Sequence, residues 1–187
     1  KGNVKQLDIR CSGRTDAGVS AIGQVCRVRT HLQANGTDEI TSSFIKNLIN
    51  SKRNENGQNA LCCVGVEEVD KSFHPTFCAT KRAYAYFIDI SNLQFIGKHC
   101  LNEFHVERLD LLLQELEGKA LDYFGVSYGK VKTETTICKL ERSRATLVNY
   151  HFNASILSSD RKAICIELVG DRFLRRMVRI LVATALR

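Results

Sequence analysis

The spacing of hydrophobic positions along the chain predicts both strands and helices. Five segments either alternate apolar with polar residues or are rich in β-branched and aromatic residues, and each is predicted as a strand: residues 21–28, 61–69, 84–90, 137–147 and 163–168. One face of the third segment carries Tyr84, Tyr86, Ile88 and Ile90. A period of two with one apolar face is typical of a strand that lies half buried in a sheet.

Three segments show the helical spacing of apolar residues. Residues 41–49 are predicted as a short helix with Thr41 or Ser42 as its N-cap, and a polar loop follows at residues 51–60. Residues 106–116 form the second helix, with an apolar stripe made of Leu109, Leu112, Leu113 and Leu116. The last helix is predicted to begin near Asp171. Because strands and helices mix without a regular strand–helix–strand order, we expect an α+β fold with a mainly antiparallel sheet and flanking helices.

The predicted C-terminal helix separates charged from apolar positions. Its arginines fall at i, i+3, i+4 and i+7, so they are expected to share one face: Arg172, Arg175, Arg176 and Arg179. Another face, which can pack into a core, carries Leu174, Val178, Leu181 and Ala185. Residues 171–187 contain five arginines and one aspartate, a net charge of +4. The stripe is either a solvated basic face or a surface that binds phosphates or pairs with a functional carboxylate.

Composition narrows the functional class. The 187-residue chain has a formal net charge of +7 and a pI near 9.1, which favours a polyanionic partner such as nucleic acid. The eight cysteines include no Cys-x-x-Cys pair, so we expect free thiols in a reducing, intracellular compartment and no structural zinc. No apolar run is long enough to cross a bilayer. Because Lys1 is not an initiator methionine, we expect the chain to be part of a longer protein.

The loop at residues 11–21, CSGRTDAGVSA, is the main candidate for chemistry. It holds Asp16 two residues before Gly18, and the glycine gives the backbone the freedom to turn. The loop is either a simple connection or a device that presents a carboxylate to a substrate. Two other polar residues outside this loop are expected to be structural: His74, and Asp122 as a cap after the leucine helix.

Three stretches of the sequence are together similar to one enzyme family. In order along the chain they are GRTDAGVSA at residues 13–21, FHPTFCATKRAYAYFI at 73–88 and GDRFLRRMVRILVATAL at 170–186. They resemble the motifs of the TruA-type tRNA pseudouridine synthases, and LEGKALDYF at 116–124 is a weaker match to the segment between the second and third motifs. Ser20 stands where bacterial members usually have histidine, which resembles the eukaryotic-like branch.

The resemblance implies roles for individual residues. Asp16 matches the nucleophile, Tyr84 the aromatic residue that stacks on the target base, and Arg179 the arginine that pairs with the aspartate. Arg14 matches the arginine that helps to hold the target nucleotide outside the RNA stack. Arginines of the second and third motifs are expected to bind the RNA: Arg82, Arg172, Arg175 and Arg176.

The resemblance also implies the reaction and the fold. Members isomerise uridine in tRNA, here expected in the anticodon stem-loop at tRNA positions 38–40, and they need neither metal nor cofactor. We therefore expect residues 1–187 to form a single catalytic domain with the pseudouridine synthase catalytic fold, lacking its N-terminal strand and helix. tRNA is the expected partner, no membrane association is expected, and a homodimer is an assembly that the sequence leaves open.

The residue types suit this chemistry. Breaking the bond between the sugar and N1 of uracil leaves an electron-deficient sugar, which a carboxylate attacks or stabilises. The carboxylate must be ionised, and a paired arginine favours the ionised form. A stacked aromatic ring retains the freed base, and phosphate contacts offset the cost of extruding the nucleotide. Two alternatives remain open: a non-catalytic RNA-binding module derived from such an enzyme, and a small-molecule glycosidase, which requires a second carboxylate.

Overall fold

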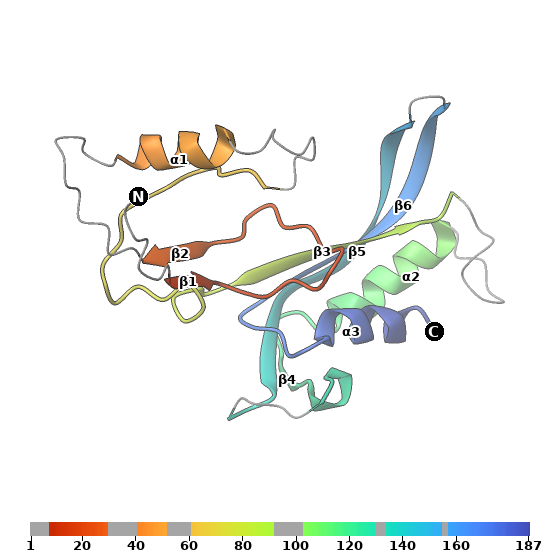
Figure 1. The fold of residues 1–187 in the computed structure, drawn as a ribbon. Coiled ribbons are helices and arrows are strands. Elements are labelled where there is room, and N and C mark those ends of the chain that lie inside the picture. The colour runs from red at the N-terminus through yellow and green to blue at the C-terminus, as the bar shows by residue number, and fades with distance from the viewer. Residues whose placement is uncertain (1–7, 30–40, 52–60, 92–102, 130–133, 155–156) are drawn as a thin grey trace. The chain divides into compact units, whose positions relative to one another are not determined.

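The structure is a computed structural model that describes residues 8–29, 41–51, 61–91, 103–129, 134–154 and 157–187 (Figure 1). The chain forms two compact units, Lys1–Ala79 and Thr80–Arg187. Both helices and antiparallel strands are present, which confirms the predicted α+β class. The single catalytic domain stays a prediction, and most of the predicted polar loop lies outside the described residues.

The first unit contains a two-stranded antiparallel sheet and one helix. β1 (Asp8–Cys11) pairs with β2 (Cys26–Arg29), and a long loop connects them. α1 (Ser42–Ser51) follows Thr41, whose hydroxyl accepts a hydrogen bond from the backbone N–H of Phe44 at 3.2 Å. This bond satisfies one of the N–H groups left open at a helix start. Thr41 is therefore confirmed as the N-cap.

Two strand predictions in this unit need correction. Residues 61–69 form no strand. The backbone of Cys63 instead bonds to the side chain of Asn50. The Oδ1 atom of Asn50 accepts from the N–H of Cys63 at 2.9 Å, and its Nδ2 atom donates to the carbonyl of Cys63 at 3.0 Å. The other strand begins at Cys26 and not at residue 21. Ile22 has a relative exposure of 101%. The alternation of apolar and polar residues before Cys26 therefore does not correspond to a strand with a buried face.

The second unit is built on a four-stranded antiparallel sheet in the order β3-β6-β5-β4. The strands are β3 (Arg82–Asp89), β4 (Ala120–Asp122), β5 (Ile137–Ala154) and β6 (Leu157–Gly170). β5 and β6 are longer than the sequence predicts. β6 pairs with β3 from Ala163 to Gly170. Between Leu157 and Ala163 it pairs only with β5, and the two strands form a two-stranded ribbon (Figure 1).

Two helices of this unit pack with the sheet around one core. They are α2 (Glu103–Gln114) and α3 (Met177–Ala185). The buried side chains of the core come from both helices and both long strands: Leu113, Leu140, Ile164, Ile166, Leu168, Met177 and Leu181. A shared core of this kind means that α2 and α3 cover the same face of the sheet.

The apolar stripe of α2 differs from the prediction, and Leu116 lies beyond the last residue of the helix, Gln114. Leu109 and Leu113 are buried as expected, but Leu112 is 56% exposed and Val106 lies in the core at 7%. The positions i, i+3 and i+7 counted from Val106 face the sheet. Leu112 fits the helical spacing from Leu109 but lies off this line of buried residues.

A carboxylate also attaches α2 to the sheet. Asp110 accepts two hydrogen bonds from the guanidinium group of Arg144 on β5, each 2.8 Å long. It accepts two more from the backbone N–H of Ala145 at 2.8 Å and the amide of Gln114 at 2.7 Å. The Arg144 hydrogen bond is the largest cause that lowers the pKa of the Asp110 carboxyl. The ionised form of Asp110 therefore stabilises the contact between helix and sheet.

The end of β6 is fixed before any helix begins. At Gly170 a Cβ would lie 2.9 Å from the Leu140 side chain and 3.0 Å from the carbonyl of Lys139, so a larger residue would force the buried Leu140 and the neighbouring backbone to shift. Asp171 then accepts hydrogen bonds from the N–H groups of Lys139 (3.0 Å) and Arg172 (2.7 Å). Asp171 therefore closes the end of the β5–β6 ladder and is not a helix cap.

The predicted start of the last helix is wrong. α3 begins only at Met177, so among the four striped arginines Arg179 alone lies on the helix. Arg176 precedes it in the left-handed conformation, with φ of 59°. Leu174 and Met177 are both buried, and the N–H of Met177 donates to the carbonyl of Leu174 at 3.1 Å. A tight turn into the core therefore replaces the first predicted turns of helix.

Candidate functional site

Asp16 occupies the first position of a tight turn in the loop between β1 and β2. The N–H of Val19 donates to the carbonyl of Asp16 at 3.2 Å, and Gly18 has φ of 77°. A positive φ at the third position is the mark of a type II turn and favours glycine. The Asp16 side chain is exposed. The turn thus presents a carboxylate where a substrate can reach it.

Hydrogen bonds hold this loop at its base. The N–H of Ser12 donates to the carbonyl of Val25 at 2.8 Å. The Gln24 side chain bridges the two sides, because it accepts from the Ser12 hydroxyl at 3.1 Å and donates to the carbonyl of Gly13. The two ends of the loop are therefore fixed by the strands, while its tip stays accessible.

His74 supports a turn beside β1, as predicted for a structural residue. Its Nδ1 accepts a hydrogen bond from the N–H of Thr76 at 3.3 Å, and its ring lies 4.4 Å from that of Phe77. The Thr76 hydroxyl donates to the carbonyl of Cys11 at 3.0 Å. These contacts give the histidine a part in the local fold.

Tyr84 lies on β3, an edge strand of the sheet in the second unit. It is the register partner of Leu168 on β6, and directly paired residues point to the same face. The Tyr84 ring meets the ring of Phe173 nearly edge-on, at 76° with centroids 4.8 Å apart. The side chain is half buried. Tyr84 thus lies half buried on the helix-covered face of the sheet.

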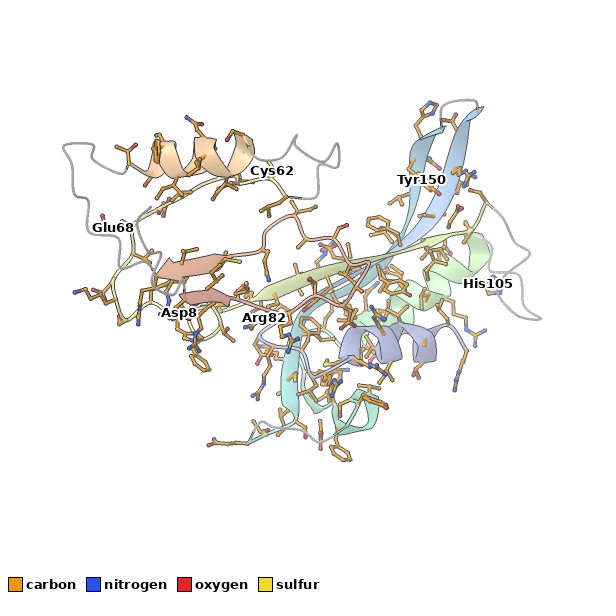
Figure 2. The ribbon with its side chains drawn as sticks, in the orientation of Figure 1. Asp8, Cys62, Glu68, Arg82, His105 and Tyr150 are labelled. Atoms are coloured by element: carbon orange, nitrogen blue, oxygen red, sulfur yellow. The ribbon has the colours of Figure 1, made fainter. Side chains whose placement is uncertain are left out.

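Two of the predicted RNA-binding arginines bond to the protein's own backbone. Arg172 donates from Nη2 to the carbonyl of Ile137 at 2.7 Å. Arg82 lies at the start of β3 (Figure 2). It donates from Nη1 to the carbonyl of Asp171 at 3.1 Å. Both bonds tie the segment after β6 to the sheet. A contact between either arginine and RNA stays a prediction.

The other two arginines of the pre-helical segment lie over one aromatic ring. The Cζ atoms of Arg175 and Arg176 are 5.7 Å and 4.3 Å from the ring centroid of Tyr128. The N–H of Tyr128 also donates to the carbonyl of Arg175 at 3.1 Å. Tyr128 is 52% exposed and follows the short helix η3 (Phe124–Val126). We call these three residues the Tyr128 cluster. Cation–π contacts hold both charged groups in defined positions at its surface.

Arg179 lies on the exposed side of α3. With Arg176, Arg187 and Thr184 it lines a surface hollow of about 490 Å³. None of the six described residues that line this hollow is acidic. Three guanidinium groups and a hydroxyl around a concave surface suit a phosphate group. Sequence analysis missed Arg187 and Tyr128, because neither carries a local signal that separates it from an ordinary surface residue.

The predicted site residues fall into two groups. Arg14 and Asp16 belong to the first unit, where both side chains are exposed. Tyr84, Arg179 and the Tyr128 cluster belong to the second unit. The contact of Phe173 with Tyr84 joins β3 to the segment that carries the arginines. The pairing of Asp16 with Arg179 stays a prediction.

Asp122 is a structural cap, as predicted. Its Oδ1 accepts hydrogen bonds from the Thr136 hydroxyl and from the N–H of Phe124, the latter at 2.9 Å. The bond from Thr136 is the larger of these two causes that lower the pKa of Asp122. Burial raises the pKa of the adjacent Tyr123 to about 12.

Within the described ranges, no group of three or more histidine, cysteine, aspartate or glutamate side chains is placed to hold a metal ion.

Three known proteins of the same name are similar to this chain. The chain is 30% identical over 183 residues to tRNA pseudouridine synthase A of Thermosipho africanus, a match that covers 98% of the chain and 68% of that protein. It is 32% identical over 179 residues to tRNA pseudouridine synthase A of Thermotoga neapolitana, covering 96% of the chain and 66% of the relative. It is 26% identical over 188 residues to tRNA pseudouridine synthase A of Borreliella burgdorferi, and this match covers 100% of the chain and 69% of the relative.

The chain spans about two thirds of the length of these curated relatives. No family model matches it. Among the helices of the described ranges, none combines the length and hydropathy needed to span a bilayer.

Proposed function

Because the chain belongs to the tRNA pseudouridine synthase A family, we propose that it isomerises uridine to pseudouridine in tRNA with Asp16 as the nucleophile. The observation that carries the proposal is the 30% identity to a synthase of that name over 98% of the chain. The exposed carboxylate on the type II turn supports the assignment of Asp16. The family is one of isomerases, so no net oxidation or reduction is involved.

The proposed reaction exchanges one bond to the ribose for another. The bond between N1 of uracil and C1′ of ribose breaks, and a bond between C5 and C1′ forms. C5 loses its proton, and N1 gains one, so atoms and electrons balance without water or a redox partner. Asp16 attacks or stabilises the electron-deficient sugar while the base turns.

Three further residues assist in the proposed mechanism. Arg179 forms a charge-assisted pair with the Asp16 carboxylate. The Tyr84 ring stacks on the base, a contact worth about 1–3 kcal/mol per base. Arg14, exposed beside Asp16, helps to hold the target nucleotide out of the RNA stack.

The basic surface of the second unit binds the RNA backbone in this proposal. Arg175, Arg176 and Arg187 are exposed, and with Arg179 they concentrate positive charge around α3. Phosphate contacts of this kind supply affinity and offset the cost of extruding a nucleotide. The hollow lined by three of these arginines supports this role. We propose that the target uridine lies in the anticodon stem-loop at tRNA positions 38–40, as the family resemblance implies.

Tritium release tests the proposal directly, because C5 loses its hydrogen only when the isomerisation occurs. The chain is incubated with tRNA that carries 5-tritiated uridine, in parallel with Asp16→Asn and Asp160→Asn. Asp160 is the matched control, since its side chain is 93% exposed on the β5–β6 ribbon and its known contact is with His151. We expect release from the parent chain and from Asp160→Asn, and none from Asp16→Asn.

Two results would overturn the proposal. Release by Asp16→Asn at the parent rate would remove Asp16 from the mechanism. RNA binding without release from any of the three proteins would instead identify a non-catalytic RNA-binding module. A steep salt dependence of that binding would separate both cases from a small-molecule glycosidase.

We also propose a reducing, intracellular site of action and a homodimer as the assembly to test. The seven cysteines in the described ranges are free thiols, which supports the first point. Sedimentation of the purified chain tests the second.

A further inference from the structure

Cys11 and Cys26 face each other at the base of the Asp16 loop. They are register partners in the β1–β2 pair, and their Sγ atoms are 3.0 Å apart. The next pair toward the loop, Ser12 and Val25, is joined by a backbone hydrogen bond. Hydrogen-bonded and non-hydrogen-bonded pairs alternate along antiparallel strands. Cys11 and Cys26 therefore form a non-hydrogen-bonded pair, in which side chains lie closest.

This position matches the geometry of a disulfide. Cα atoms of a non-hydrogen-bonded pair are about 4.5 Å apart, inside the range of about 4.4–6.8 Å that disulfides span. The strands are already in register, so a bond between the sulfurs needs rotation of two side chains and no backbone movement. Both thiols are also exposed, so a small oxidant reaches them.

We propose that Cys11 and Cys26 are a site of reversible oxidation, where hydrogen peroxide generates a disulfide that closes the loop carrying Asp16. This proposal goes beyond the proposed function and does not depend on it. The Ser12–Val25 and Gln24 bonds already hold the base of the loop. The disulfide makes that closure covalent and lasts until a thiol reductant removes it.

The two sulfurs take different parts in the reaction. The hydrogen bond with Cys11 is the largest cause that raises the pKa of Cys26 to about 11, so Cys26 is a thiol at neutral pH. One of the two thiols and peroxide give a sulfenic acid and one water, and the other thiol then displaces a second water to form the S–S bond. The two electrons lost by the thiols reduce the O–O bond of peroxide.

Other cysteines bond to backbone groups instead. Cys63 donates to the carbonyl of Gly65 at 3.5 Å, and Cys78 accepts from the N–H of His74 at 3.4 Å. Cys138 is buried. Because Cys78 is exposed and lies in the same unit, it is the matched control.

Peptide mapping tests the proposal. The full chain at low concentration is treated with peroxide, its remaining thiols are blocked, and it is digested with trypsin without reductant. Trypsin cleaves after Arg10, Arg14 and Arg27, so Cys11 lies in CSGR and Cys26 in TDAGVSAIGQVCR. We expect these two peptides as one disulfide-linked species, lighter by two hydrogen atoms than their sum. Dithiothreitol should separate them.

Variants decide which sulfurs are involved. Cys11→Ser and Cys26→Ser should each abolish the linked species, whereas Cys78→Ser should leave it at the parent level. Circular dichroism checks that each variant is folded. The proposal fails if peroxide converts Cys11 to the sulfinic or sulfonic acid without a cross-link. It also fails if the main disulfide joins Cys11 or Cys26 to another cysteine or to a second chain.

Discussion

Replacing Tyr128 by alanine should weaken tRNA binding by about 5- to 30-fold. The ring holds the guanidinium groups of Arg175 and Arg176 at 5.7 Å and 4.3 Å from its centroid. An exposed cation–π contact contributes about 0.5–1 kcal/mol, so two contribute about 1–2 kcal/mol to the ordering of both side chains. Without the ring, RNA binding must supply that ordering itself. Because about 1.4 kcal/mol changes an affinity tenfold, a loss of about 1–2 kcal/mol weakens tRNA binding by about 5- to 30-fold.

The salt dependence of binding separates this effect from a loss of charge. Tyr128→Ala keeps both arginines, so the slope of log affinity against log salt should stay near the parent value. Arg176→Ala removes one cation and should reduce that slope by about 0.7–0.9. Tyr128→Phe keeps the ring and should bind nearly as well as the parent chain. Fluorescence anisotropy of labelled tRNA at four salt concentrations measures all three variants.

Two outcomes would refute this reasoning. Parent affinity in Tyr128→Ala would mean that the ring does not order the arginines for RNA. A slope in Tyr128→Ala as small as in Arg176→Ala would mean that the variant has lost phosphate contacts outright. Because Tyr128 is 52% exposed, we expect little change in melting temperature, and a thermal melt checks that both variants are folded.

Further predictions concern the remaining site residues and the stability of the second unit. In single-turnover assays, Asp16→Asn should abolish product formation and bind tRNA within about twofold of the parent chain, as filter binding would show. Arg179→Ala should slow the same assay by at least about tenfold, since a charge-assisted hydrogen bond contributes about 1.5–3 kcal/mol; parent rates would exclude the pairing with Asp16. The pKa of Asp110 is lower in the folded protein than in the unfolded chain, where it is about 3.9. The stability that the Asp110 carboxylate contributes is therefore present above about pH 3.9 and is lost as the pH falls toward the folded-state pKa. Asp110→Asn should cost about 2 kcal/mol at neutral pH, and urea melts from pH 7 to pH 3 should show that the variant has a smaller loss at acid pH.

Sequence patterns predicted elements well where local rules act alone. The N-cap at Thr41 and the cap at Asp122 need only a short polar side chain beside open N–H groups. The strand at β3 follows from the alternation of apolar residues, although Tyr86 on the predicted inner face is 41% exposed. By contrast, the arginine spacing after Gly170 predicted helical turns before Met177 that are absent. The requirement to bury Leu174 and Met177 after a closed strand end overrides the local helical pattern.

The sequence by itself determined the fold class, the family resemblance and the candidate carboxylate, because these depend on residue types and spacings within short stretches. Only the tertiary structure placed Arg175 and Arg176 over Tyr128, and Cys11 against Cys26. Each of these contacts joins residues that are distant in sequence. Register between strands and the path of a turn fix such distances, and neither is encoded in a local pattern.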